Sequence, residues 1–139
     1  MDCAEYILEH QVGFILRQVS QRHAAIFAAK IGDDLTPTQW ATLAKLLERG
    51  PCSQNLLGRH TAMDAATIKG VVDRLTKRRF VETRPDPKDA RRVVVALTPA
   101  GRAIAERARA NAEAITEETL QPLTASERSL FLKLLKKLV

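Results

Sequence analysis

The spacing of apolar residues along this chain changes from helical to strand-like and back again, and these two changes limit the folds it can adopt. Up to about Arg79, apolar residues recur mostly at three- and four-residue steps, which is typical of amphipathic helices. Residues 80–84 and 92–97 are instead rich in β-branched and aromatic side chains, and a polar stretch with two prolines separates them. This pattern predicts two strands joined by a stiffened turn. Helical spacing returns at Thr98, so we expect a mainly α fold with a small β wing.

Helix-capping sequences divide the rest of the chain. Residues 36–39 place a threonine cap before a proline, with a glutamine three residues after the cap, and residues 124–127 form a similar box that ends in glutamate. Thr98-Pro99 repeats the threonine-proline start, while Gly50-Pro51 and Pro122 interrupt helices. The predicted helices span about residues 6–30, 36–49, 53–60, 64–78, 98–119 and 124–138.

The positive charge of the chain is concentrated in one part of it. The 22 Lys and Arg residues against 16 Asp and Glu residues give a net charge of +6. Residues 58–92 hold ten basic and five acidic side chains, so almost the whole excess lies in this quarter of the sequence. A basic surface of this kind is typical of proteins that face nucleic-acid phosphates, although a solvated charged face is the alternative.

Length and composition exclude several other classes. A chain of 139 residues suits one domain, or a small subunit that completes its core by pairing. It has no uncharged apolar run of membrane-spanning length and begins with acidic residues where a signal peptide is basic, so we expect a cytoplasmic protein with no membrane partner. Cys3 and Cys52 are the only cysteines and lack metal-ligand spacing, so neither a disulfide nor a metal site is predicted.

The predicted helices over residues 53–60 and 64–78 are expected to form a helix-turn-helix. In the second helix, small side chains allow close approach to base edges, Thr67 and Lys69 can hydrogen-bond to bases, and later basic residues can clamp phosphates. The alternative is that alanine and glycine here only permit tight helix packing. The candidate DNA contacts in this pair are Ser53, Gln54, Ala65, Ala66, Thr67, Lys69, Arg74, Lys77 and Arg78.

The predicted wing adds a second basic group. Arg84, Lys88, Arg91 and Arg92 lie on the two strands and their turn. Arg91 follows the tip of the turn and can enter a narrow minor groove, where the negative potential is enhanced. Asp89, two residues earlier, is expected to orient the guanidinium of Arg91 by a charge-assisted hydrogen bond. Without the preceding helices, the same segment reads as an ordinary solvated hairpin loop.

These residues resemble the MarR family of winged helix-turn-helix repressors. Asp89-Ala90-Arg91, followed after five residues by Leu97-Thr98, matches the wing signature of that family, and supporting matches occur at residues 35–40, 73–75, 79–81, 86–89 and 98–101. The resemblance covers nearly the whole chain. It implies a single MarR-type domain over residues 1–139, with a DNA-binding lobe at 35–98 and dimerisation helices at 1–34 and 99–139. It also implies a homodimer on a pseudo-palindromic double-stranded DNA operator.

The resemblance further implies a small-molecule effector, often an aromatic carboxylic acid, bound between the dimerisation helices and the winged lobe. Residues 11–17 and 21–23 look like those of repressors of aromatic-acid catabolism, including repressors that respond to 6-hydroxynicotinate. A cation beside aromatic walls suits a flat anion, and the alternative for the same residues is ordinary packing and surface roles. No other cofactor is expected. The candidate effector contacts are Phe14, Arg17, Ser20, His23 and Trp40.

Other hypotheses remain open from the sequence. Some family members sense peroxides through a cysteine of the first helix, but the acidic neighbours of Cys3 disfavour its thiolate. A metal sensor is another hypothesis, because Glu5, Glu9 and His10 have helical spacing. The sequence holds only three histidines, however, which are few for a metal site. A sequence-neutral architectural DNA-binding protein would share the basic surface without needing an effector. No nucleophile with its base, carboxylate pair or phosphate-binding glycine loop is visible in the sequence, so no enzymatic activity is expected.

Overall fold

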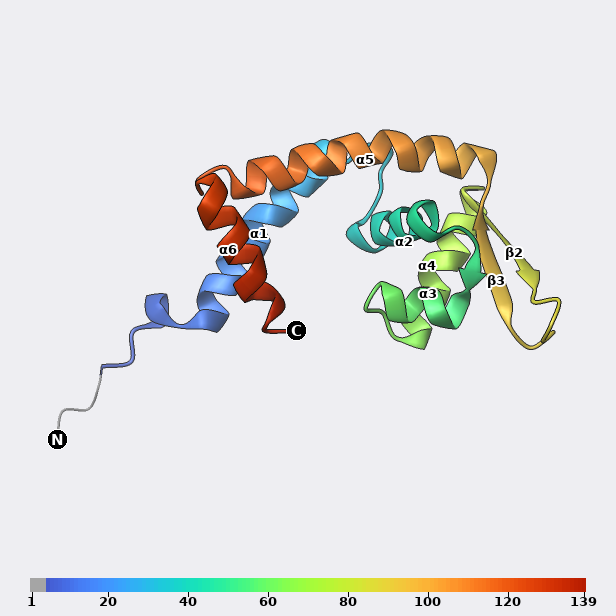
Figure 1. Ribbon diagram of the computed structural model, residues 1–139, viewed down its shortest axis with the longest axis horizontal. Coiled ribbons are helices and arrows are strands. Elements are labelled where there is room, and N and C mark those ends of the chain that lie inside the picture. Colours follow the sequence, from blue (N-terminus) through green and yellow to red (C-terminus); the bar gives the residue numbers. More distant parts are fainter. Residues whose placement is uncertain (1–4) are drawn as a thin grey trace. The chain divides into compact units, whose positions relative to one another are not determined.

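The structure is a computed structural model and describes residues 5–139 (Figure 1). Two compact units are present. The first contains the described residues up to Lys30 together with Glu113–Val139, and the second contains Ile31–Ala112. The mainly helical fold with a small β wing is confirmed. The elements in chain order are the 3-10 helix η1 (Leu8–His10), α1 (Val12–Lys30), α2 (Pro37–Arg49), β1 (Cys52–Ser53), α3 (Gln54–His60), α4 (Ala65–Lys77), β2 (Val81–Pro85), β3 (Val93–Leu97), α5 (Pro99–Leu120) and α6 (Ala125–Lys136).

The core of the second unit is formed by α2, α3, α4 and the sheet. Each helix contributes one apolar stripe, and burying each leucine, isoleucine or valine side chain stabilises the fold by about 1.5–3 kcal/mol. Because α4 is buried along one stripe only, its opposite face stays exposed. The leucine, isoleucine and valine side chains of this unit with at most 1% of their surface exposed are Leu43, Leu46, Leu57, Ile68, Val71, Val72, Leu75 and Val95.

Both predicted capping boxes are present. The Thr36 hydroxyl accepts the N–H of Gln39 at 3.2 Å, and the Gln39 side chain accepts the N–H of Thr36 at 3.4 Å. The Thr124 hydroxyl likewise accepts the N–H of Glu127 at 3.3 Å, and the Glu127 carboxylate accepts the N–H of Thr124 at 2.9 Å. Since a capping box satisfies backbone N–H groups that have no partner within the helix, it fixes the first residues of α2 and α6.

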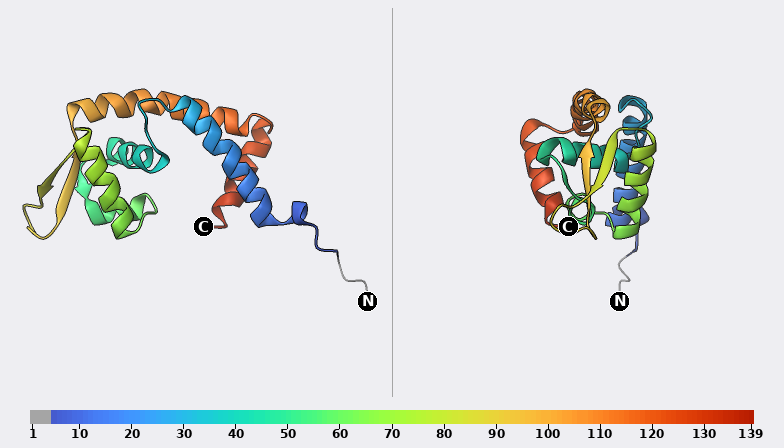
Figure 2. Two further views of the ribbon diagram at one scale, coloured as in Figure 1. Left: turned by 180° about the vertical axis from the view of Figure 1, so that it is seen from behind. Right: turned by 90° about the vertical axis from the view of Figure 1, so that its right-hand side faces the viewer.

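The sheet has three antiparallel strands in the order β1-β3-β2, whereas the sequence predicted two. The predicted pair is β2 and β3, which align Val81 with Leu97 and form the hairpin seen in Figure 2. The additional strand β1 pairs Cys52 with Val95. The prediction missed β1 because two residues are too few to show an alternation of apolar and polar side chains.

The start of α5 lies close to the segment that precedes β2. The N–H of Thr98 donates to the carbonyl of Phe80 at 3.1 Å, and the Thr98 hydroxyl donates to the carbonyl of Arg79 at 2.7 Å. A Cβ atom added to Gly101 would lie only 1.8 Å from the Phe80 carbonyl oxygen. Position 101 therefore requires glycine, because the backbone of α5 approaches that carbonyl too closely for any side chain.

The first unit contains η1, α1, α6 and the last residues of α5. The first helix begins at Val12, so the prediction of one continuous helix from Tyr6 was wrong. Leu8–His10 form a 3-10 turn, and Gln11 has extended backbone angles with φ −90° and ψ 135°. The Gln11 side chain donates to the carbonyl of Ile7 at 2.9 Å. One extended residue leaves the spacing of apolar residues nearly unchanged, so periodicity alone does not reveal the break.

Within this unit, α1 and α6 expose many large apolar side chains. A hollow of about 520 Å³ lies between η1, α1 and α6 and is lined mostly by such residues. Monomeric proteins rarely expose continuous apolar surface of this extent. The exposed apolar residues of α1 and the C-terminal region are Val12, Ile15, Leu16, Val19, Leu130, Phe131, Leu132, Leu134, Leu138 and Val139.

No helix in residues 5–139 combines the length and the apolar character that crossing a membrane requires.

Candidate nucleic-acid interface and effector contacts

Helix α4 presents an exposed polar and basic face, and an aspartate caps its start. The Asp64 carboxylate accepts the N–H of Thr67 at 2.7 Å, and this hydrogen bond holds the pKa of Asp64 below its ordinary value. The cap fixes the first turn of α4, where the predicted base-contacting residues lie. The exposed candidate contacts of this helix are Ala65, Ala66, Thr67, Lys69, Arg74 and Lys77.

Two of these basic side chains already have neighbours on α4. The Lys69 ammonium lies 2.9 Å from the Asp73 carboxylate in an exposed ion pair. A Cβ atom added to Gly70 would lie 3.6 Å from a guanidinium nitrogen of Arg74, so the Arg74 side chain extends back beside the backbone at Gly70. Exposed ion pairs are weak, so the Lys69 ammonium remains able to exchange Asp73 for a phosphate or a base.

Arg78 has a structural role that the sequence did not predict. Its guanidinium donates to the carbonyl oxygens of Asp33 and Asp34 and, at 3.2 Å, to the side-chain oxygen of Gln39. It also lies 4.7 Å from the centroid of the Phe80 ring, and the residue is half-buried. These contacts direct the Arg78 guanidinium to partners within the second unit, and the phosphate clamp expected at this position stays a prediction.

The wing tip is organised by two aspartates. The Asp89 carboxylate accepts the backbone N–H of Arg91 at 3.0 Å and its Nε–H at 3.2 Å, and lies 3.8 Å from Nε of Arg92. Asp86 accepts the N–H of Lys88 at 2.9 Å. The contact between Asp89 and Arg91 expected from the sequence is therefore present. The Arg91 side chain is 92% exposed, so its remaining guanidinium donors face solvent.

A small polar hollow joins the wing to the start of α3. Its volume is about 110 Å³, and it is lined by Ser53, Gln54 and Asn55 together with residues 91–93. Pairing of β1 with β3 brings these sequence-distant segments together. Ser53 is partly committed already, since its hydroxyl caps α3 by accepting the N–H of Leu56 at 3.2 Å. Asn55 was absent from the predicted contacts because its place in the hollow depends on the unpredicted strand β1.

Four of the five predicted effector contacts lie on α1 in the first unit. The guanidinium of Arg17 lies 5.6 Å from the centroid of the Phe14 ring, within the range of a cation–π contact. Ser20 and His23 line a hollow of about 390 Å³ with Thr116, Thr119 and apolar residues of α1, α5 and α6. His23 is exposed. Its Nδ1 lies 2.8 Å from the Thr119 hydroxyl oxygen.

The fifth predicted contact, Trp40, belongs to the second unit. It is half-buried on α2 and lines a hollow of about 350 Å³ with Ala44, Leu47, Glu48 and Arg109. An aromatic ring and a guanidinium beside one hollow are groups that suit an aromatic anion. Arg109 could not be singled out from the sequence, because it is one of three arginines on α5.

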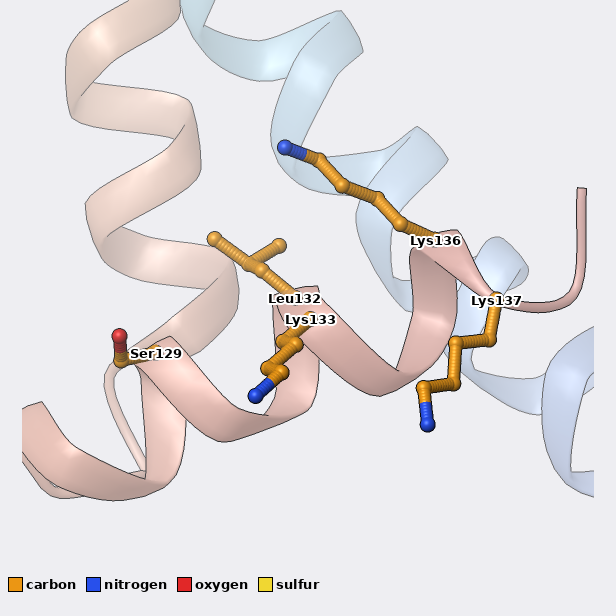
Figure 3. A pocket seen from close by; sticks show the side chains of 5 residues that line it. All are labelled: Ser129, Leu132, Lys133, Lys136 and Lys137. Atoms are coloured by element: carbon orange, nitrogen blue, oxygen red, sulfur yellow. The ribbon is translucent and has the colours of Figure 1, made fainter.

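A further hollow lies on the surface of α6 and is rich in lysine. Its volume is about 580 Å³, and Figure 3 shows the five residues that line it. In this view Lys133 and Lys137 extend on one side of the helix and Lys136 on the other. Ser129 and Leu132 complete the lining. These lysines lie outside the basic segment at residues 58–92, so the first unit has a basic group of its own.

The described residues contain neither an activated thiol nor a group of side chains suited to a metal ion. Burial raises the pKa of the half-buried Cys52 thiol, which disfavours its reactive thiolate. Cys3, the residue of the peroxide-sensing hypothesis, lies outside the described residues. Across residues 5–139, no three His, Cys, Asp or Glu side chains are grouped closely enough to hold a metal ion.

An exposed, basic α4 beside an arginine-bearing hairpin defines the second unit as a winged helix-turn-helix, a fold of DNA-binding proteins. Comparison with known proteins agrees. The profile of the MarR family matches residues 33–92. The chain is 42% identical over 140 residues to the HTH-type transcriptional repressor NicR of Pseudomonas putida, an alignment that covers 100% of this chain and 89% of NicR. The chain therefore belongs to the MarR family of transcriptional regulators.

Two solved structures are similar over nearly the full length. A probable transcriptional regulator from Pseudomonas aeruginosa has a TM-score of 0.93 and 55% identity, covering 96% of this chain and 100% of that one. BpsR of Bordetella bronchiseptica has a TM-score of 0.92 and 40% identity, covering 97% of each chain. The BpsR structure addresses the regulation of its DNA binding by 6-hydroxynicotinic acid. These relatives are regulators rather than enzymes.

Proposed function

We propose that this chain is a cytoplasmic, homodimeric repressor that binds a pseudo-palindromic double-stranded DNA operator and is released by a small aromatic carboxylic acid. The observation that carries the DNA-binding part is the exposed polar face of α4 beside a wing whose Arg91 side chain is 92% exposed. Residues 1–139 act as one functional domain, with no cofactor and no membrane partner.

In this proposal the start of α4 reads the major groove and the wing reaches the minor groove. Ala65, Ala66 and Thr67 meet base edges together with Lys69, since small and hydroxyl side chains permit close approach. Arg91, oriented by Asp89, enters the minor groove. The residues assigned to phosphates and to the neighbouring backbone are Ser53, Gln54, Arg74, Lys77, Arg84, Lys88 and Arg92.

The effector assignment rests on different observations. Similarity to BpsR over 97% of both chains makes 6-hydroxynicotinate the first acid to test. On α1, Arg17 and His23 can pair with a carboxylate, Phe14 offers an aromatic wall, and Ser20 lines the hollow beside His23. Trp40 supplies a second aromatic surface, beside Arg109.

Pairing with a second copy completes the mechanism. The exposed apolar side chains of α1 and α6 support such pairing. Effector binding then favours a dimer whose two recognition helices are wrongly spaced for the operator. The acid lowers operator affinity only to the extent that it binds that state more tightly than the DNA-bound state.

A fluorescence anisotropy titration tests the whole proposal. Purified protein is titrated onto the DNA upstream of its own gene and onto a scrambled duplex at near-physiological salt, with and without 6-hydroxynicotinate and related aromatic acids. We expect tighter binding to the upstream DNA and release by one acid. Equal binding to both duplexes would favour a sequence-neutral architectural protein. Specific binding that no acid weakens would favour the hypothesis of a peroxide-sensing repressor that uses Cys3.

The α1 residues are tested in the same assay. His23→Ala and Arg17→Ala should each raise the acid concentration needed for release while leaving operator affinity without acid unchanged, because neither residue lies in the second unit. Unchanged sensitivity to the acid would return both residues to structural roles.

A further inference from the structure

The Thr119 hydroxyl has a different partner from those of two other helical threonines. Thr42 and Thr76 direct their hydroxyl protons to the carbonyl four residues earlier, at 2.8 and 2.7 Å. Such bonds are a common way for a helical threonine to satisfy its hydroxyl locally. Thr119 instead points across to α1, with its oxygen 2.8 Å from Nδ1 of His23. Its hydroxyl is therefore directed at a side chain that the proposed function assigns to effector binding.

The backbone that carries Thr119 is held against α1 by two further contacts. The Arg22 guanidinium donates to the carbonyls of Thr119 and Glu118 at 2.7 and 2.9 Å, and the Lys30 ammonium lies 2.6 Å from the Glu118 carboxylate. The last carbonyls of a helix have no partner within it, so a guanidinium at this end both satisfies them and complements the helix dipole. Thr119 thus has a fixed position from which to orient the imidazole of His23.

The direction of the hydrogen bond between the Thr119 hydroxyl and Nδ1 determines what the other ring nitrogen presents, because a hydroxyl can donate to Nδ1 or accept from Nδ1–H. When neutral imidazole accepts the Thr119 proton at Nδ1, its own proton resides on Nε2, and in the imidazolium both nitrogens carry protons. In both of these states Nε2 donates a hydrogen bond, whereas a neutral ring that donates from Nδ1 to Thr119 would leave Nε2 as an acceptor. His23 and Thr119 line the same hollow of about 390 Å³, whose lining is otherwise mostly apolar. A single oriented N–H donor in an apolar hollow suits one oxygen of a carboxylate.

We infer that Thr119 is a positioning residue: it holds the His23 imidazole with its proton on Nε2, set to donate to the carboxylate of an aromatic acid. The inference rests on the proposed function, because that function makes His23 an effector contact. The tautomer itself does not depend on the effector, so the two claims are tested separately.

The first test is nitrogen-15 NMR of the imidazole rings in the full chain without effector, with the His23 signals assigned by their loss in His23→Gln. We expect the Nε2–H tautomer in the wild type and in Thr119→Ser, which keeps the hydroxyl. In Thr119→Val, which keeps the shape but loses the hydroxyl, the two tautomers should mix. An Nδ1–H tautomer in the wild type, or the same tautomer in all three proteins, would overturn the inference.

The second test measures release from operator DNA by 6-hydroxynicotinate. Thr119→Val should raise the half-release concentration on the order of tenfold, since it leaves the imidazole without its orienting bond, whereas Thr119→Ser should stay close to wild type. Operator affinity without acid and the melting temperature should match in all three proteins. Equal release of Thr119→Val and wild type would refute the positioning role. Wild-type protein that no acid releases would instead refute the proposed function, and the NMR result would still decide whether Thr119 sets the tautomer.

Discussion

Arg78 and Arg91 have the same charge and lie on the same basic segment, yet the structure gives them different roles. Arg78 is half-buried, and its donors bind the carbonyls of residues 33 and 34 and the side chain of Gln39. Arg91 is exposed and held by one carboxylate. The sequence does not separate the two, because the partners of Arg78 lie far away along the chain. A count of basic residues therefore does not separate an arginine bonded within the fold from one that faces solvent.

Replacing each arginine by alanine should separate stability from DNA binding. Arg78→Ala should lower the free energy of unfolding by about 1–3 kcal/mol, because the buried Gln39 side chain and the carbonyls of Asp33 and Asp34 lose their donor. Arg91→Ala should leave stability unchanged and weaken operator binding on the order of tenfold, with a smaller salt dependence. Urea denaturation and anisotropy titration measure the two effects. Equal operator affinity in Arg91→Ala would remove the wing from the proposed interface.

Gly101 supplies a second residue-scale prediction. Gly101→Ala forces a Cβ atom into the Phe80 carbonyl, which lies 1.8 Å from where that atom would stand, so we expect a loss of about 3 kcal/mol in unfolding free energy. Gly70→Ala is the matched control. Its added Cβ makes ordinary contact with the Arg74 side chain, and alanine should stabilise α4 by about 0.5–1 kcal/mol. Thermal melts that fall for Gly70→Ala or hold for Gly101→Ala would contradict this account.

At the scale of single elements, caps explain why the helices start where they do. The capping boxes at Thr36 and Thr124 were predicted from the sequence, and both are present in the structure. The capping residue Asp64 makes the start of α4 sensitive to pH. Its folded pKa lies below the unfolded value, so the ionised cap stabilises the fold above that unfolded value, and this contribution is lost as pH falls through the folded pKa.

Asp64→Asn tests this dependence, since asparagine caps a helix about as well but does not titrate. As the pH falls from above the ordinary aspartate pKa through the lowered folded pKa of Asp64, we expect the wild type to lose more stability than Asp64→Asn. Urea denaturation at several pH values measures the difference. Parallel pH profiles would show that Asp64 contributes nothing to the acid sensitivity of α4.

The sequence predicts well those features that depend on neighbouring residues along the chain. Caps, prolines and apolar periodicity located the helices and the hairpin to within a few residues. The strand β1 and the break at Gln11 had no such signal, since one depends on pairing with a distant strand and the other is a single extended residue. The same limit applies to the sites. The wing motif predicted the contact between Asp89 and Arg91, while the contacts of Thr119 and Asn55 depend on partners that are distant in the sequence.

At the scale of the whole molecule, we expect a second copy of the chain to cover the exposed apolar surface of α1 and α6. We expect Leu134→Glu to convert a dimer into a monomer in size-exclusion chromatography with light scattering, because it places a charge on this surface, where Leu134 is 49% exposed. Ala103→Glu, at an exposed position of α5, is the control and should leave the mass unchanged. A dimer that persists in Leu134→Glu would place the pairing surface elsewhere.

The order β1-β3-β2 also determines how the second unit can open. Pairing of Cys52 with Val95 closes a loop that contains α3, α4 and β2, so both helices of the DNA-reading motif lie between the two paired positions. The entropy cost of closing such a loop grows only slowly with its length, so one pairing closes the whole segment at little more cost than a shorter loop. As the central strand, β3 can be freed only by separating it from neighbours on both sides. Its amide protons should therefore be among the slowest in this unit to exchange with solvent, and they should exchange together with those of α4 rather than with those of the wing tip.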